Sequence, residues 1–445
     1  MVTADTLWDE LQSRWPESQL EPSLSRIASV VELMGDPHRV VPVIQVAGTN
    51  GKSSTARMTE SILRAYGVRT GLFTSPHLVR VAERICLDGV PVSDERLLAA
   101  WHEAEPYIRV VDAQSQADGG PRLSFFEVLT ALAFAIFADA PVDVAVIEVG
   151  MGGTWDATNV VDAQVCIVTP IGLDHMEYLG DTIAAIAGEK AGIITADTEV
   201  VLAEQSREAA DVLQARCAGF GISPQCEGIE FAVTDRVVAV GGQMIGVRGT
   251  RGVYPELFLP LLGDHQSHNA ACAIAGVESF LHQALDVDLV REGLAQVLIP
   301  GRLQMVRQGP AVIIDAAHNP HGAAALATAL QQYYSFDSVI GVVGMLQGKD
   351  ALGFLEILMP VVDELVITAP QSPRALSAAD LAAVAESVSG VLPISVVASV
   401  PDAIDTAIGI AESRPGVSAV VIAGSVVLAG DAMRVLDAAP WKGES

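Results

Sequence analysis

The stretch VIQVAGTNGKSS, residues 43–54, decides how the chain around it folds. An apolar run leads into a short glycine turn and then into Lys52 and two serines, and a helix-like segment follows from Thr55 to Tyr66. Glycines let backbone N–H groups point inward, the helix N-terminus adds positive potential, and the lysine supplies a mobile cation. Because Val46 stands where the long pattern has glycine, the match is to the shorter G-x-x-G-K-S form. The alternative is a plain glycine turn, but the strand before it and the helix after it favour a phosphate-binding loop.

The composition excludes several classes of protein. The 445 residues are half hydrophobic, yet no uncharged apolar run approaches the length of a membrane span, and Met1 to Glu10 lacks the apolar core of a secretory signal. The five cysteines contain no C-x-x-C pair, which is typical of reduced thiols in a cytoplasmic protein. The net charge of −28 and the absence of a dense Lys/Arg cluster exclude nucleic-acid binding. An anionic nucleotide would therefore need a divalent metal, helix N-termini and a few fixed cations.

The first half of the chain predicts a parallel α/β sheet. After a helical region in residues 1–40, apolar runs at Gly67–Thr74, Val142–Val149 and Val165–Thr169 read as buried strands. Polar residues follow the end of each run, which places a site at the carboxyl edge of the sheet.

The second half predicts an insertion and then a second domain. Thr234–Gly252 has short β-like runs and several glycines, which indicate a hairpin-rich insertion, and a helix is expected at Asn269–Gln283. The Pro-Gly break at Ile299–Arg302 precedes a new set of strands alternating with Ala-rich helices, at Val312–Asp315, Val339–Val343, Leu365–Thr368 and Ala419–Ala423. We therefore expect an α/β protein with a P-loop, parallel-sheet ATPase domain at residues 1–299 and a smaller, Rossmann-like α/β domain at residues 300–445.

Three polar residues lie at or just beyond probable strand ends: Ser75, Glu148 and His175. An acid opposite a phosphate loop can hold Mg²⁺, although a capping or surface acid explains Glu148 equally well when it is taken alone. A single histidine is more often structural, and Mg²⁺ prefers oxygen ligands, so the convergence of the three positions carries the metal-site hypothesis.

Seven motifs make a family resemblance specific. They are GTNGK (48–52), TSPHL (74–78), EVGMGG (148–153), DATN (156–159), EKAGI (189–193), PGR (300–302) and DAAHNP (315–320). In this order they resemble folylpolyglutamate synthase/dihydrofolate synthase, of the Mur-type ATP-dependent amide ligases. The resemblance runs from the first strand to about residue 430, which is nearly the whole chain.

The resemblance implies a role for each matching residue. The ATP-binding positions would be Thr49, Asn50, Gly51, Lys52, Ser53, Ser54, Asn269, Arg302 and Asp315. Ser75, Glu148 and His175 would ligate Mg²⁺, and Lys190 would be the lysine that becomes carbamylated and helps to place a second Mg²⁺. His318 and Ser425 would lie near the incoming glutamate.

The resemblance also implies where the pterin–benzoate substrate binds. The positions are Glu21, Ser124, Phe125, Phe126, Glu127, Trp155, Asp156 and Ala157. Aromatic faces suit a flat heterocycle and acids suit its amino-pyrimidine edge, whereas core packing at the start of a helix is the alternative for the phenylalanine pair.

The sequence departs from the family pattern at two places. Ser53 and Ser54 follow the loop lysine where the family commonly has glycine and then Ser or Thr, so the hydroxyl that faces the phosphates or the metal is open. Thr154 and Trp155 replace the usual Arg and Leu before DATN, which leaves the ligase chemistry intact but changes the pterin pocket.

The expected activity is ligation of L-glutamate to dihydropteroate or a reduced folate. ATP would phosphorylate the substrate carboxylate, the glutamate amine would attack the acyl phosphate, and the two domains would close about Pro300-Gly301. We expect a bifunctional, monomeric enzyme. The alternatives are a Mur-type ligase that adds an amino acid to a cell-wall precursor and a nucleotide-binding regulator that performs no ligation.

Overall fold

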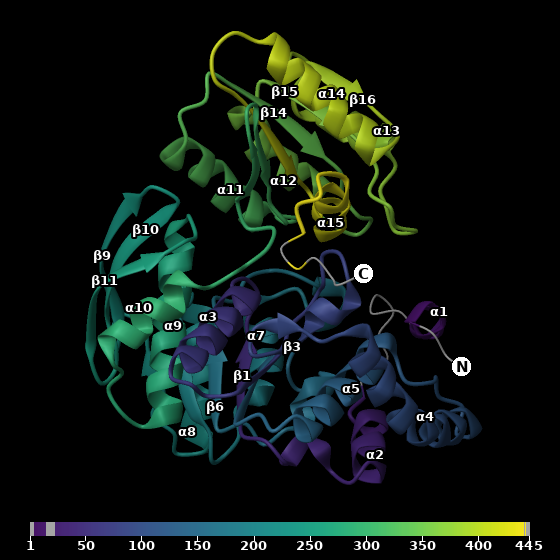
Figure 1. Ribbon diagram of the computed structural model, residues 1–445, viewed down its shortest axis with the longest axis vertical. Helices are drawn as coiled ribbons and strands as arrows, with labels where there is room; N and C mark the ends of the chain where they lie inside the picture. Colours follow the sequence, from purple (N-terminus) through teal and green to yellow (C-terminus); the bar gives the residue numbers. More distant parts are fainter. Residues whose placement is uncertain (1–3, 15–22, 440, 442–445) are drawn as a thin grey trace.

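The computed structural model describes residues 4–14, 23–439 and 441, which form two bodies (Figure 1). The N-terminal body contains the elements α1 to α10, and the C-terminal body contains β12 to α15. In the described part of the chain, no helix combines the length and the apolar character that a membrane span requires.

An eight-stranded sheet forms the centre of the N-terminal body, in the order β4-β3-β2-β5-β1-β6-β7-β8. Its strands are β1 (Val43–Ala47), β2 (Thr70–Phe73), β3 (Ile85–Leu87), β4 (Val90–Pro91), β5 (Val144–Glu148), β6 (Val165–Val168), β7 (Glu199–Leu202) and β8 (Gln225–Cys226). β1 pairs in parallel with both β5 and β6, whereas β3 and β4 form an antiparallel edge. The loop after β1 is therefore flanked by the loops that follow two neighbouring strands, as a site at the carboxyl edge requires.

Helices cover both faces of this sheet. They are α1 (Ala4–Ser13), α2 (Ser25–Leu33), α3 (Lys52–Ala65), α4 (Asp94–Ala117), α5 (Phe125–Asp139), α6 (Met176–Leu179), α7 (Ile183–Lys190), α8 (Arg207–Gly219), α9 (Asp264–Leu281) and α10 (Val287–Ala295), with the 3-10 turns η1 (Pro37–Arg39), η2 (Val81–Arg84), η3 (Ala157–Val160) and η4 (Ala191–Ile193). Within β1, Val43 and Ala47 join the core beneath α2, α4 and α5, while Ile44 and Val46 face α3 and α9. This alternation buries both faces of the sheet, so the strand is apolar except for the buried Gln45.

The predicted insertion is a three-stranded antiparallel sheet. Its strands are β9 (Ala232–Ala239), β10 (Gly242–Arg248) and β11 (Val253–Leu259), and β10 lies in the middle. Ile245 and Val247 of β10 pack with α9 and α10 in the second core. The three-stranded sheet therefore packs against α9 and α10, and these two helices lie beside α3, the helix that follows the P-loop.

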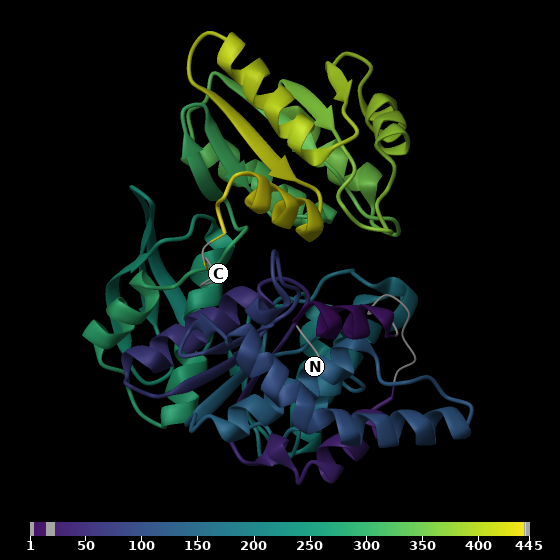
Figure 2. The same cartoon turned by 45° about the vertical axis from the view of Figure 1, so that its right-hand side comes forward.

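The C-terminal body is a second doubly wound sheet, in the order β12-β13-β17-β14-β15-β16. Its elements are β12 (Gln304–Gln308), β13 (Ala311–Ile314), α11 (Pro320–Tyr333), β14 (Ser338–Val343), α12 (Ala351–Leu358), η5 (Met359–Val361), β15 (Glu364–Ile367), α13 (Ala378–Val388), β16 (Ile394–Val396), α14 (Val400–Ser413), β17 (Ser418–Ala423) and α15 (Val426–Val435). Only β12 is antiparallel to its neighbour. In both views the C-terminal body lies above the N-terminal body, with α15 at its lower end (Figures 1 and 2).

Several expected elements differ in extent from those in the structure. The loop expected from Gln114 begins only at Asp118, because α4 continues to Ala117. The helix expected from Asn269 begins at Asp264 and so includes the polar HQSH segment. Strand β12 was not predicted, since its alternating polar residues face solvent on an edge.

Candidate functional site

The turn between β1 and α3 can be built only with glycine at two positions. Gly51 caps α3 with φ +87, and a Cβ there would lie 2.4 Å from Asn269 Oδ1. Gly48 has φ +141, and its Cβ would lie 1.8 Å from Thr169 Oγ1. The backbone of the loop is therefore in direct contact with α9 on one side and with the end of β6 on the other.

The segment after β6 holds the loop in place. The amides of Thr49 and Asn50 donate to Pro170 O at 3.0 and 3.3 Å, and the hydroxyl of Thr49 bonds with the backbone of Gly172. The first N–H groups of α3 then remain at the open helix end, where an anion is stabilised. Asn269 lies beside this turn, and its Nδ2 donates to Gln266 Oε1 at 3.1 Å.

A buried carboxylate lies next to the loop lysine. Glu148 accepts from Ser53 Oγ at 2.8 Å and from the amide of Ser75 at 3.0 Å, while Lys52 Nζ donates to Thr49 O at 3.2 Å. Burial raises the pKa of Glu148, and Lys52 is the strongest influence that opposes the rise. In this geometry Ser53 faces the acid, whereas Ser54 is buried.

The segment after β6 also brings a histidine and an acid into the space between the bodies. His175 adopts φ 51, and burial lowers its pKa to about 4, so its imidazole is neutral. Burial by itself would raise the pKa of Asp174. The charges of His175 and Lys349 have a larger, opposite effect and lower the pKa of Asp174 to about 2. Asp174 Oδ1 lies 3.1 Å from Lys349 Nζ, which comes from the C-terminal body. This ion pair joins the carboxyl edges of the two parallel sheets.

Lys190 reaches the loop from the end of α7. Its Nζ donates to Gly48 O at 2.6 Å, and the residue is only 4% exposed. Burial and the nearby cation of Lys52 lower the pKa of Lys190 to about 7. A large share of the amine is therefore neutral, and nucleophilic, near neutral pH.

The C-terminal body presents four of the predicted residues. Asp315 is buried, and its two oxygens accept from the amides of Leu303 and Ala317 at 2.9 and 2.8 Å. His318 Nδ1 bonds with Ala316 O at 2.9 Å, and burial lowers its pKa to about 4.

The other two predicted residues of this body differ in how they are engaged. The guanidinium of Arg302 makes no hydrogen bond or ion pair with any residue that the structure describes, although its charge reaches Asp315. Ser425 is buried and caps α15 through the amide of Leu428.

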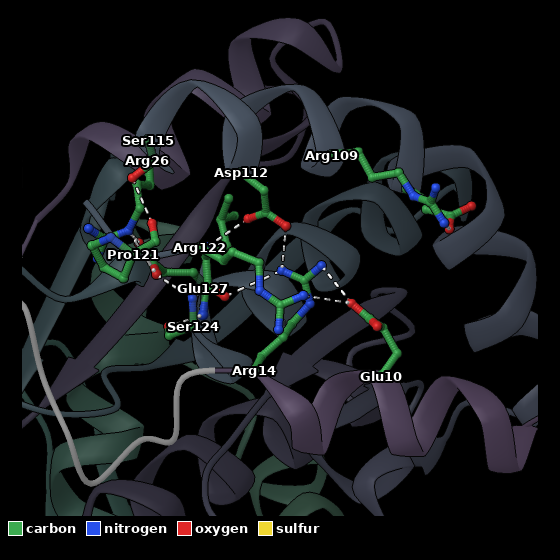
Figure 3. A network of polar contacts seen from close by, with 12 residues as sticks. Glu10, Arg14, Arg26, Arg109, Asp112, Ser115, Pro121, Arg122, Ser124 and Glu127 are labelled. Carbon is green, nitrogen blue, oxygen red and sulfur yellow. Dashed lines mark hydrogen bonds and ion pairs between the residues drawn. The ribbon is translucent and has the colours of Figure 1, made fainter. Parts of the chain in front are cut away.

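Two of the predicted substrate residues form the start of α5. Ser124 and Glu127 make a reciprocal capping box, and Glu127 also pairs with Arg26 at 3.1 Å (Figure 3). Beside them Arg14, the residue after α1, pairs with Asp112 of α4 at 3.0 Å. The carboxylate of Glu127 is thus already engaged, and its contacts fix the N-terminus of the helix that carries the two phenylalanines.

The two phenylalanines have different surroundings. Phe126 packs over Gly150, where a Cβ would lie 2.5 Å from its ring, and its centroid is 5.7 Å from that of Phe73. Phe125 lies edge-on to Trp8 at 6.1 Å and beneath the guanidinium of Arg84 at 5.1 Å.

The turn after β5 holds three further predicted residues. Asp156 is buried, accepts from Thr158 and from the amide of Met151 at 2.8 Å, and has a pKa raised by burial. Trp155 packs on Gly152, and Ala157 is buried. Glu21, the remaining predicted substrate residue, lies outside the described residues.

The sequence interpretation missed Lys349, and a usable signal was present. The chain contains only four lysines: Lys52, Lys190, Lys349 and Lys442. Three of them converge between the two bodies, in a protein whose net charge is −28. Within the described residues no three His, Cys, Asp or Glu side chains gather as a metal cluster, so a metal here would need hydroxyl or phosphate oxygens as well.

Comparisons with known proteins agree with this geometry. Residues 115–277 match the Mur ligase middle domain, and residues 301–426 match the Mur ligase glutamate ligase domain. The chain is 48% identical over 445 residues to a dihydrofolate synthase/folylpolyglutamate synthase of Mycobacterium tuberculosis, covering 95% of this chain and 91% of the relative. It is 36% identical over 368 residues to the enzyme of that name from Escherichia coli, covering 81% of each.

Solved structures show the same similarity. Mycobacterium tuberculosis folylpolyglutamate synthase complexed with ADP and AMPPCP matches with a TM-score of 0.93 and 47% identity, over 97% of this chain and 98% of that one. An Escherichia coli relative in complex with DHPP and ADP matches with a TM-score of 0.85 and 31% identity, over 98% of each chain. The chain therefore belongs to the dihydrofolate synthase/folylpolyglutamate synthase family of the Mur ligases and is an ATP-dependent ligase that joins glutamate to folates.

Proposed function

We propose that ligation takes place between the carboxyl edges of the two sheets, and the Asp174–Lys349 ion pair is the observation that carries this proposal. The pair places the C-terminal loop that carries Lys349 against the segment after β6, and that segment holds the P-loop through Pro170. A folate carboxylate attacks the γ-phosphorus of ATP, which gives an acyl phosphate and ADP. The amine of glutamate then attacks the acyl carbon, loses a proton, and expels phosphate as the amide bond forms.

Within this scheme the chain supplies positioning and charge rather than a nucleophile. Lys52, the N-terminus of α3 and Arg302 offset the charge of the transferring phosphoryl group. The unpaired guanidinium of Arg302 is suited to this role, because no ion pair with a described residue must first be broken. Asp315 orients the segment that carries Arg302 by accepting the amides of Leu303 and Ala317.

The residues around Glu148 fit a magnesium ion. A buried carboxylate beside the hydroxyl of Ser53 and the start of the Ser75 segment offers the hard oxygen donors that Mg²⁺ prefers, and the burial that raises the pKa of Glu148 withholds the water that would otherwise solvate its charge. Ser75, Glu148 and the neutral His175 would hold the ion, with nucleotide phosphates completing its shell. When bound, it would neutralise charge on the phosphates.

We further propose that Lys190 is carbamylated in the working enzyme. Burial lowers the pKa of the Lys190 amine to about 7, so about half of it is neutral near pH 7. A neutral amine can add to CO₂, lose a proton and become an anionic carbamate. The product would turn a cation beside Gly48 into a carboxylate-like group suited to a second Mg²⁺. Intact-mass measurement in bicarbonate buffer should find one added CO₂ in the wild type and none in Lys190→Met.

The pterin end is proposed to bind near Phe126, Trp155 and Asp156, which meet around the glycine turn after β5. The ring faces offer stacking surfaces, and the buried acid offers hydrogen bonds to the amino-pyrimidine edge. Phe125 would extend this surface towards Arg84. The engaged carboxylate of Glu127 suits it to support the pocket rather than to contact the ligand.

One experiment separates this proposal from its rivals. ADP release is measured with ATP, an acceptor and glutamate, and each is omitted in turn. Activity that requires both glutamate and a pteridine acceptor supports the proposal, whereas ADP release without either indicates a nucleotide switch. Dihydropteroate and tetrahydrofolate as alternative acceptors test the expected bifunctionality.

We also propose a domain boundary at residues 299/300, a monomer in solution and a cytoplasmic location. Light scattering after size-exclusion chromatography tests the monomer. Limited proteolysis near Pro300 tests the boundary.

A further inference from the structure

The last helix of the chain contacts the N-terminal body at the loop that carries Ser75. This loop, residues 74–79, follows β2 and is here called the Ser75 loop. A Cβ on Gly430 of α15 would lie 1.9 Å from Leu78 O, so the helix and the loop backbone are in van der Waals contact. Arg434 of the same helix donates to Val79 O at 3.4 Å.

Beyond α15 the chain contacts the N-terminal body again, on the P-loop helix. The ring of Trp441 lies 5.0 Å from the guanidinium carbon of Arg57, which belongs to α3. A cavity of about 170 Å³ remains between Trp441, α3, the β3–β4 turn and residues 296–298. Trp441 is therefore seated beside the segment that connects the two bodies.

Arg57 links this contact to the Ser75 loop. The same guanidinium that lies over Trp441 donates through Nη2 to Thr74 Oγ1 at 3.3 Å. The next residue, Ser75, bonds Glu148 through its amide at 3.0 Å. The C-terminal segment therefore contacts both ends of the Ser75 loop. Gly430 and Arg434 contact it directly at Leu78 and Val79, and Trp441 contacts it at Thr74 through Arg57. We call Gly430, Arg434 and Trp441 the strap.

We propose that the strap positions the Ser75 loop, so that the contact of the C-terminal segment with the N-terminal body controls nucleotide affinity at the nucleotide end of the site. The strap residues are positioning residues, because each acts through the loop or through Arg57. Identifying that end as the nucleotide site rests on the proposed function. If the strap were ordinary packing, its loss would lower stability without changing the loop or nucleotide affinity.

The first test uses a pair of helical glycines in the C-terminal body. Gly430→Ala places a methyl group against Leu78 O, while Gly409→Ala in α14 meets open space and is the matched control. Amide exchange of residues 74–80 is followed by mass spectrometry in the nucleotide-free protein. We expect faster exchange in Gly430→Ala alone, and equal exchange in the two variants overturns the proposal.

The second test uses Trp441, where a phenylalanine keeps the contact with Arg57. We expect Trp441→Ala to speed exchange of residues 74–80 and to weaken Mg-ADP binding by about two- to fivefold, as loss of one exposed cation–π pair implies. Trp441→Phe should restore most of both. Phe220→Ala, which removes a similar pair with Arg216 in α8, should change neither.

The outcomes separate the strap from the ligase assignment. The proposal for the strap is overturned if residues 74–80 of Trp441→Ala exchange at the wild-type rate, or if they exchange faster while the affinity for Mg-ADP is unchanged. It is also overturned if Trp441→Phe fails to restore the exchange rate and the affinity. If the wild-type chain binds Mg-ADP but shows no glutamate-dependent ADP release, the proposed ligation is refuted while the proposal for the strap is retained. A wild-type chain that binds no Mg-ADP overturns both.

Discussion

Replacing Lys190 by methionine should stabilise the apo protein while abolishing its activity. The fall of the Lys190 pKa from 10.5 to about 7 is equivalent to about 5 kcal/mol against the charged form in the folded state. The substitution also leaves Gly48 O without its hydrogen-bond donor, and this loss lowers the stability of the variant by about 1–3 kcal/mol. We therefore expect a net gain of about 2–4 kcal/mol near pH 7.

The sign of the pH dependence follows from the direction of the shift. A lysine whose folded pKa is depressed destabilises the fold fully below that pKa, because both states are then protonated. The penalty fades as pH rises towards the unfolded pKa, since the unfolded chain binds more protons in that window. The advantage of Lys190→Met should thus shrink by about 2 kcal/mol between about pH 7 and about pH 9.

Urea unfolding at these two pH values is the assay, in CO₂-depleted buffer with a chelator and no nucleotide. Lys349→Met is the control, because it removes a lysine held in an ion pair rather than a desolvated one. A Lys190→Met protein that is less stable than the wild type at both pH values, or whose difference does not change with pH, refutes the reasoning. Catalytic activity above background in that variant refutes its proposed role.

Further outcomes follow from the site. Lys52→Ala should abolish glutamate-dependent ADP release while circular dichroism and unfolding stay near wild type, and near-normal turnover would contradict the proposed mechanism. Ser53→Ala should lower the affinity for Mg²⁺ with nucleotide, measured calorimetrically, because its hydroxyl bonds Glu148; the same change at Ser54 should chiefly lower stability. Lys349→Met and Asp174→Asn should each slow turnover, and the double variant should be no worse than the poorer single, whereas additive losses would mean that the two residues act separately.

The fold was predictable from the sequence because its strongest signals are local. The strands β1, β5 and β6 are short apolar runs that both faces of the sheet bury, so each was visible without knowledge of the rest. Edge strand β12 was missed for the converse reason, since its side chains are largely exposed and its apolar pattern is weak. Helix α9 was shortened in the prediction because its first five residues, DHQSH, are polar.

The site was less predictable, because its contacts join residues far apart in sequence. The position of Ser75 at a strand end was readable, but its bond to Glu148 depends on β2 and β5 being neighbours in the sheet. Nothing local distinguishes Ser53 from Ser54; the orientation of α3 against β5 makes the difference. Lys349 was overlooked because its partner, Asp174, lies in the other body.

The positions of the cations explain how an acidic chain can bind an anionic ligand. A net charge of −28 opposes nucleotide binding at long range, but that field is screened within about 10 Å at ordinary ionic strength. Inside that distance the cations of Lys52 and Arg302 dominate, and the low local dielectric strengthens their action; among the described residues Arg302 has no ion-pair partner. Because Arg302 belongs to the C-terminal body, part of this local positive charge is supplied only when the two bodies meet. Domain approach therefore adds electrostatic attraction as well as geometry.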